Sequence, residues 1–181
     1  MTSFEKMSYA RKLPDGRYQM GTKAVQLASA FEKSLDERLA IESCLSRLVA
    51  TTGESAFFYI SDNGHRLCLF GADSPQSLRV NQKIGVSISL DETSISRVLK
   101  QYDRAPARKS GYEDDMVRYS IGVFDPLTSS ISAPVFGAGG RFVGALSISG
   151  PTQRFDVTKP GNLACVAREA RRLSVELGYD A

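Results

Sequence analysis

Runs of apolar residues at regular spacing divide the chain into short elements. From Thr22 onward the apolar side chains recur every three to four positions, which predicts a helix over 22–33. Ser34 is followed three residues later by Glu37, the pattern of a capping box. A second helix should therefore follow and end at Gly53, so we expect two consecutive helices with a bend near Lys33 and Ser34.

Turn residues between apolar segments predict three hairpins. They are centred on Pro14-Asp15-Gly16, on Asp62-Asn63-Gly64 and on 137–140, where Gly and Asn tolerate positive φ. Leu78 to Val80 is a candidate short strand. The segment 104–128 has no readable period.

Two further helices are expected in the second half of the chain. Asp91 has the residue type of an N-cap for a short helix, and Pro160 that of a first helical residue for a long one ending near Gly178. Antiparallel hairpins between helices predict an α+β domain with the helices on one face of a sheet.

Serines alternate with apolar residues along the last hairpin. A turn centred on Ala138 and Gly139 would set Ser130 opposite Ser147, and alternation would then place four hydroxyls on one face of the sheet. That face is either a solvent-facing surface or the floor of a pocket, and the pattern alone does not choose between them. The four residues are Ser130, Ser132, Ser147 and Ser149.

Composition and charge narrow the function classes. The 181 residues carry a formal charge of only +3, too small to indicate nucleic-acid binding over the whole chain. The single histidine, His65, follows a turn and should be exposed, and the three cysteines are far apart, so we expect no metal site, no cofactor and no disulfide. We find no catalytic constellation and expect a protein that is not an enzyme.

Targeting features are not evident. No apolar run approaches the about 20 residues of a membrane span, and the first residues lack the apolar core of a signal peptide. We therefore expect a cytoplasmic protein with no membrane partner, whose cysteines are buried reduced thiols.

Several motifs resemble one family of bacterial transcription factors. RLVATTGES, SISAPVF and ALSISGPTQRF, in this order, are similar to the C-terminal regulatory region of the IclR (isocitrate lyase regulator) family, and Arg17-Tyr18-Gln19-Met20-Gly21 resembles the family's wing strand. The resemblance covers nearly the whole chain. It implies a GAF-like effector domain (34–181) behind a linker helix (22–33) and the remnant wing (1–21) of a winged helix-turn-helix.

The resemblance also implies partners. In the intact protein the wing cations Arg11, Lys12 and Arg17 would lie against DNA phosphates, and the recognition helix would lie upstream of residue 1. The family forms homodimers or tetramers, and Leu27 and Ala30 on the linker helix are candidate contacts.

Family pockets bind small metabolites, and the matching positions here are Ser130, Ser147, Ser149, and Ser94 and Ile95 at the short helix. Ser132 joins this set through the alternation of the strand. The sequence departs from the family at this helix, where Asp91 and Glu92 would oppose the positive potential that a helix N-terminus offers an anion.

Two alternatives to a DNA-binding regulator remain. One is a stand-alone GAF-like sensor that acts on a protein partner. The other is a GAF-fold, cysteine-dependent sulfoxide reductase, which requires two cysteines that can approach and a reactive thiolate among Cys44, Cys68 and Cys165.

Overall fold

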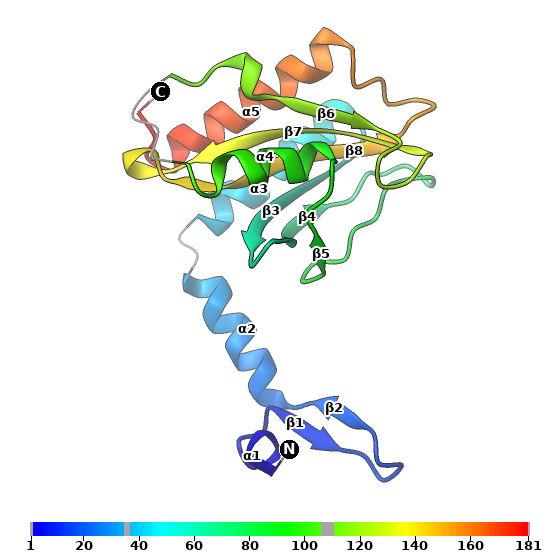
Figure 1. Ribbon diagram of the computed structural model, residues 1–181, viewed down its shortest axis with the longest axis vertical. Coiled ribbons are helices and arrows are strands. Elements are labelled where there is room, and N and C mark those ends of the chain that lie inside the picture. The colour runs from blue at the N-terminus through cyan, green and yellow to red at the C-terminus, as the bar shows by residue number, and fades with distance from the viewer. Residues whose placement is uncertain (1, 35–36, 106–110, 181) are drawn as a thin grey trace. The chain divides into compact units, whose positions relative to one another are not determined.

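The computed structural model describes residues 2–34, 37–105 and 111–180, which form two compact units (Figure 1). The smaller unit is Met1–Arg38 and the larger is Leu39–Ala181. The predicted capping box includes residues 35 and 36, which lie outside the described residues. The two helices predicted on either side of it are both present, as α2 (Thr22–Ser34) and α3 (Arg38–Thr52).

The smaller unit is built on the first predicted hairpin. A short helix, α1 (Thr2–Lys6), precedes strands β1 (Ala10–Lys12) and β2 (Tyr18–Met20), which pair antiparallel, and α2 follows. The turn needs Gly16, whose φ is +86°, and Gly21 is required because a Cβ there would lie 2.1 Å from the carbonyl oxygen of Ser8. Close backbone contact thus explains the glycine that ends the wing-like motif.

The larger unit contains a six-stranded antiparallel sheet in the order β5-β4-β3-β8-β7-β6. Its fold class is α+β, as predicted. The strands, followed by the two helices that complete this unit, are β3 (Ser55–Asp62), β4 (His65–Ala72), β5 (Ser87–Ser89), β6 (Arg118–Ile121), β7 (Thr128–Phe136), β8 (Phe142–Pro151), α4 (Ser94–Tyr102) and α5 (Pro160–Glu176).

Helices cover both faces of this sheet, so the expectation of a single covered face is wrong (Figure 1). α4 packs on the face that carries the serines, because Ser94 contacts Ser130 and Ser132. α3 and α5 lie on the other face, joined by an ion pair between Arg47 and Glu169 at 2.8 Å.

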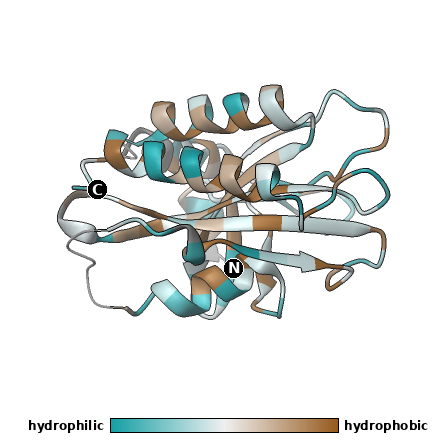
Figure 2. Ribbon diagram, turned by 90° about the horizontal axis from the view of Figure 1, so that it is seen from above, coloured by the Kyte–Doolittle hydropathy of each residue, from teal (hydrophilic) through white to brown (hydrophobic). Residues whose placement is uncertain are grey.

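The core lies between the sheet and these helices. Along the helices that lie in the foreground of Figure 2, hydrophobic residues alternate with hydrophilic ones, as expected for elements with one buried face. Full burial of each large side chain contributes about 1.5–3 kcal/mol. The largest fully buried side chains include Ile41, Leu45, Leu48, Phe57, Phe58, Leu99, Ile131, Leu146, Ile148 and Leu173.

Three local predictions need correction. Leu78–Val80 is not a strand, and the edge strand next to β4 is Ser87–Ser89. The N-cap of α4 is Thr93, two residues after Asp91, and its side chain accepts a hydrogen bond from the Ser96 amide. The segment 104–128 contains β6, whose pairing with β7 is a long-range contact that a local pattern does not report.

The register of the last hairpin differs from the prediction by two residues. Ser132 lies opposite Ser147, and Ser130 lies opposite Ser149. The turn is one residue longer than assumed, and a bulge between Val135 and Phe136 adds the second residue. Because the error is even, the four serines still share one face of the sheet, as the alternation predicts.

Candidate functional site

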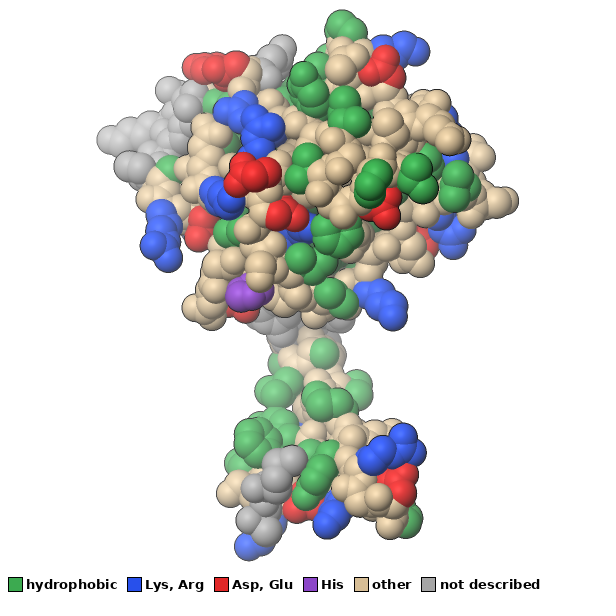
Figure 3. Space-filling model, turned by 45° about the vertical axis from the view of Figure 1, so that its right-hand side comes forward, with side chains coloured by type: hydrophobic (Ala, Val, Ile, Leu, Met, Phe, Trp, Pro, Cys, Tyr) green, Lys and Arg blue, Asp and Glu red, His purple; other side chains and the backbone are tan. Residues whose placement is uncertain are grey.

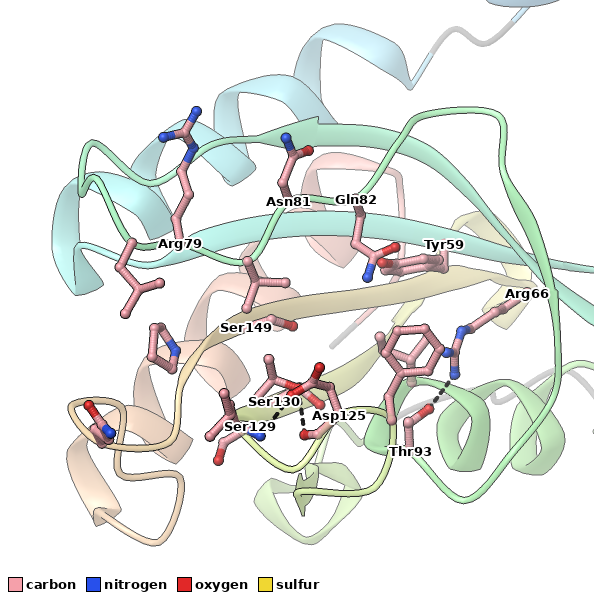
Figure 4. A pocket seen from close by; sticks show the side chains of 18 residues that line it. Tyr59, Arg66, Arg79, Asn81, Gln82, Thr93, Asp125, Ser129, Ser130 and Ser149 are labelled. Atoms are coloured by element: carbon pink, nitrogen blue, oxygen red, sulfur yellow. Dashed lines mark hydrogen bonds between the residues drawn. The ribbon is translucent and has the colours of Figure 1, made fainter.

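A cavity of about 400 Å³ opens on the serine-bearing face of the sheet, beside the start of α4 (Figure 4). It lies over β3, β4, β7 and β8, and two connecting segments, 78–82 and 124–127, complete its wall. The lining side chains belong to Tyr59, Arg66, Leu78, Arg79, Val80, Asn81, Gln82, Thr93, Ile95, Phe124, Asp125, Leu127, Thr128, Ser129, Ser130, Ser149, Pro151 and Gln153.

Three of the predicted effector-site residues line this cavity, namely Ile95, Ser130 and Ser149. Ile95 reaches it from the first turn of α4, and the two serines are paired across β7 and β8. Ser130 and Ser149 are 9% and 7% exposed, so each side chain keeps a small contact with the space above it.

The other three predicted residues lie behind the cavity floor. Ser94, Ser132 and Ser147 are fully buried and are not among the lining residues. The face is therefore neither a solvent-facing surface nor a pocket floor along its whole length, because α4 covers the part that contains these hydroxyls. Short side chains allow the helix to approach the sheet closely there.

The buried hydroxyls form one continuous hydrogen-bonded chain. Ser94 Oγ lies 2.7 Å from Ser130 Oγ and 2.8 Å from Ser132 Oγ. Ser120 Oγ of β6 lies 3.0 Å from Ser130 Oγ, and Ser132 donates to Ser147 at 3.0 Å. The chain thus joins β6, β7, β8 and α4, and only its Ser130 member reaches the cavity.

Arg66 is a buried cationic residue of the cavity wall, and sequence reasoning missed it. It projects from β4 and is 3% exposed. Its Nη1 atom lies 2.6 Å from Asp91 Oδ1, 2.5 Å from Thr93 Oγ1 and 2.9 Å from Ser96 Oγ. The guanidinium carbon also lies 5.2 Å from the centre of the Phe124 ring, within range of a cation–π interaction.

Asp91 therefore does not act on the cavity as a free acid. Burial by itself would raise the pKa of this carboxyl, but hydrogen bonds from Thr93 and Ser96 and the charge of Arg66 outweigh burial and lower the pKa to about 2. The carboxylate neutralises Arg66 and anchors the loop before α4. The negative charge of Asp91, which was expected to disfavour an anionic ligand, is thus largely neutralised by Arg66.

A signal for Arg66 is present in the sequence. It is a charged residue at the start of the otherwise apolar strand segment RLCLF, and a buried charge usually has a partner. The partner was unpredictable, since Asp91 is 25 residues away and is brought close only when α4 packs on the sheet.

The mouth of the cavity includes three large apolar side chains beside polar ones. Leu78, Phe124 and Leu127 line it while remaining 65%, 55% and 69% exposed. Figure 3 shows hydrophobic side chains among uncharged ones over one face of the larger unit, with charged groups between them. A ligand with an apolar body and a few polar groups fits this combination of mouth and floor.

An ion pair between the exposed Arg154 and the buried Glu54 holds the segment that carries Gln153. Arg154 binds the carboxylate of Glu54 through two hydrogen bonds, Nε to Oε1 at 2.6 Å and Nη2 to Oε2 at 2.8 Å. Gly150 is needed beside this pair because a Cβ there would lie 2.6 Å from the Glu54 carboxyl group. This contact accounts for Gly150 and Arg154 of the ALSISGPTQRF motif.

The cysteines have environments that disfavour thiolates. All three are free and buried. Burial raises the pKa of Cys44 to about 12 and that of Cys68 to about 11, and burial also raises the pKa of Cys165. A sulfoxide reductase needs the opposite shift.

His65 is exposed, as expected, and the described residues contain no group of three His, Cys, Asp or Glu side chains that could hold a metal.

The predicted wing cations lie on the exposed hairpin of the smaller unit. Arg11 donates to the Gln19 side chain at 3.0 Å, and Arg17 forms an ion pair with Asp15 at 2.7 Å. Lys12 is exposed at the end of β1. Figure 3 shows Lys and Arg side chains on the surface of this unit.

No helix in the described residues is long and apolar enough to cross a membrane.

Comparisons with known proteins give a match at the level of fold. No protein-family model matches the sequence, and no curated protein sequence matches it. Among solved structures, the IclR-family transcriptional regulator of Brucella abortus superposes with a TM-score of 0.77 at 16% identity, covering 97% of this chain and 77% of that one.

Two further regulators match in the same way. The Alicyclobacillus acidocaldarius IclR regulator has a TM-score of 0.76 at 15% identity, covering 98% of this chain and 82% of that one. Thermotoga maritima IclR has a TM-score of 0.72 at 17% identity, with 99% and 83% covered. The chain therefore has the GAF-like α+β fold of IclR-family transcriptional regulators over about four fifths of their length.

Proposed function

We propose that this chain is the effector-binding and oligomerisation region of an IclR-family DNA-binding transcriptional regulator that senses a small metabolite. Residues 34–181 form the effector domain, 22–33 the linker helix and 1–21 the wing. The observation that carries the proposal is a cavity lined by both polar and apolar side chains in a domain with the regulators' fold.

The dimensions of the cavity suit a small metabolite. A volume of about 400 Å³ lies at the lower end of the range for small-molecule sites. Serine hydroxyls, the Tyr59 side chain and the Arg66 guanidinium provide hydrogen-bonding groups, while Ile95 and Phe124 provide apolar contact. Such a site orients a ligand by a few polar contacts and excludes water with the rest.

The lining elements suggest how binding could be transmitted. The cavity touches the first turn of α4, strands β7 and β8, and the segments 78–82 and 124–127. A ligand that binds one arrangement of these segments more tightly shifts the population toward it. In the intact regulator, this shift would bias the arrangement of the DNA-binding heads.

Oligomerisation through α2 is supported by its exposed apolar side chains. Val25 is 71% exposed and Leu27 is 52% exposed, and Ala30 is also exposed. A helix of 13 residues in water is marginally stable without packing of its apolar side chains. A second copy of the chain, as a homodimer or within a tetramer, would cover them.

Contact with DNA is assigned to the hairpin of the smaller unit. Arg11, Lys12 and Arg17 would bind phosphates, a contact that is independent of base sequence. Replacing Lys12 with alanine should weaken binding to any duplex and lower the slope of log K against log salt by about 1. Fluorescence anisotropy in a salt titration measures this slope, and Lys83→Ala, on an exposed loop, serves as the control.

The ligand function is tested by filling the cavity. We expect a thermal-shift screen of central metabolites to yield a ligand that, at about 100 times its Kd, stabilises the protein by about 2.7 kcal/mol, a rise in Tm of roughly 5–10 °C. Ser149→Leu should abolish its binding in calorimetry, while Ser46→Leu, on the exposed side of α3, should not. Undiminished binding to Ser149→Leu would refute the site.

A further inference from the structure

We propose that the cavity floor selects a ligand that carries a hydroxyl group, because the buried serine chain leaves its cavity-facing member able only to accept a hydrogen bond. The inference rests on the proposed ligand-binding function and specifies the chemistry of the group that binds at Ser130 and Ser149.

The direction of the serine chain follows from its buried end. Ser147 donates its only hydroxyl hydrogen to the carbonyl oxygen of Ile131 at 3.2 Å. It can therefore only accept from Ser132, which lies 3.0 Å away and donates its own hydrogen there. Each remaining serine of the chain also has one hydrogen, so the direction passes from one member to the next.

The same argument continues toward the cavity. Ser132 has already donated its hydrogen, so Ser94 must donate to Ser132 across their 2.8 Å contact. Ser130 must then donate to Ser94 at 2.7 Å, and Ser120 to Ser130 at 3.0 Å. The amide of Ser94 donates to Ser120 at 3.0 Å, which agrees with this direction because it uses Ser120 as an acceptor.

Ser130 consequently offers the cavity one lone pair and no hydrogen. A hydroxyl oxygen has one hydrogen and two acceptor sites, and Ser130 uses the hydrogen for Ser94 and one acceptor site for Ser120. A carbonyl, ether or carboxylate oxygen placed against Ser130 would meet a second acceptor. Such a ligand would bind there only by breaking a bond in the buried chain, which is unfavourable in a site shielded from water.

Ser149 completes the selection. It lies directly opposite Ser130 on β8 and lines the same cavity, and its hydroxyl has no hydrogen-bond partner among the described residues. Opposite residues on paired strands have Cβ atoms about 4.5–5.5 Å apart, so one ligand atom can reach both side chains. A ligand hydroxyl would donate to Ser130 and accept from Ser149, which satisfies both.

The test uses two probes of equal size, cyclohexanol and cyclohexanone, which differ in whether the oxygen carries a hydrogen. Their binding is followed by the amide shifts of Ile95 and Ser149 in ¹⁵N-labelled protein. We expect cyclohexanol to bind about threefold to tenfold more tightly than cyclohexanone, the factor that one net hydrogen bond provides.

Ser147→Ala supplies the decisive variant, since it removes the end of the chain without touching the cavity lining. Ser132 then donates to Ser94, Ser94 donates to Ser130, and the Ser130 hydrogen is free to point into the cavity. Cyclohexanone should bind this variant more tightly, and the ratio of cyclohexanol to cyclohexanone affinity should fall close to 1. If Ser147→Ala does not fold, Ser132→Ala has the same consequence, because Ser94 then has no acceptor other than Ser130.

Ser174→Ala is the matched control. Ser174 is also fully buried and also makes two hydrogen bonds, to Phe136 N and Ala170 O, but outside the chain. The ratio of cyclohexanol to cyclohexanone affinity in Ser174→Ala should equal that of the unmodified protein. Equal binding of the two probes, or a preference unchanged by Ser147→Ala, would overturn the inference while leaving the ligand site intact. Absence of any shift at the cavity residues with either probe would overturn both proposals.

Discussion

Asp91 offers a quantitative test of the electrostatics around the cavity. In the folded protein its carboxylate lies 2.6 Å from Arg66 Nη1, whose side chain is 4% exposed. Replacing Asp91 with asparagine keeps the size of the side chain and removes the charge. Arg66 then remains buried with neutral hydrogen-bond partners only, so we expect the folded state to lose stability at neutral pH.

The magnitude follows from the pKa of Asp91. The pKa falls from its usual 3.8 to about 2 in the folded protein. Since a change of one in pKa corresponds to about 1.4 kcal/mol, the upper bound is about 2.5 kcal/mol. The Asp91 side chain is 33% exposed, so solvent screening reduces the expected loss to about 1–2 kcal/mol.

The sign of the pH dependence is defined. Because the folded-state pKa is below the unfolded one, the stabilisation is complete above about pH 5 and is lost as the pH falls toward 2. Urea unfolding of the unmodified protein and of Asp91→Asn should therefore show a difference of about 1–2 kcal/mol at pH 7 that shrinks as the pH approaches 2.

The neighbouring acid provides the control. Glu92 pairs with Lys100 at 2.7 Å, but the two side chains are 76% and 42% exposed, so Glu92→Gln should change the free energy of unfolding by less than about 0.5 kcal/mol. A difference between the unmodified protein and Asp91→Asn that stays constant from pH 7 to pH 2.5 would refute the assignment of the stabilisation to this charge.

Two further predictions concern the Gly150 contact and the buried thiols. Gly150→Ala should lower the free energy of unfolding in urea by more than about 2 kcal/mol, because the new Cβ would displace the buried Glu54 carboxylate from Arg154. Gly161→Ala, in helix α5 with nothing within 4 Å, should not lower it. Equal effects of the two would contradict this contact. The three thiols should react with a disulfide reagent at pH 8 only after denaturation, since burial raises the pKa of each; rapid reaction of the native protein would revive a thiol-based function.

The serine-bearing face illustrates how far a periodic pattern extends. Alternation along two strands was sufficient to place four hydroxyls on one face, and an error of two residues in the register left this placement unchanged. Which of these serines line the cavity depends on where α4 covers the sheet. The packing of α4 on the sheet joins Ser94 to Ser130 and Ser132, which are 36 and 38 positions away along the chain. No local periodicity predicts such a contact.

Local chemistry in the sequence determined the turns and the helix start. Asn63 and Gly64 have positive φ, as an Asn-Gly turn requires, and Pro160 occupies the first turn of α5, where its missing amide hydrogen costs nothing. These features depend on the conformational preferences of one or two residues, so the sequence alone predicts them. The motifs likewise predicted the regulator fold. They contain Gly21, Gly150 and Arg154, whose close contacts require these residue types.

Only the tertiary structure decided the chemistry of the cavity. Arg66, Asp91 and Thr93 meet because β4 and the start of α4 pack together, and the edge strand β6 exists because β7 supplies its hydrogen-bond partners. Even the hydrogen-bonding capacity of Ser130 depends on a chain that ends at Ile131, several hydroxyls away. The physical reason is that hydrogen-bond direction and charge pairing depend on neighbours in space, whereas the sequence orders neighbours along the chain.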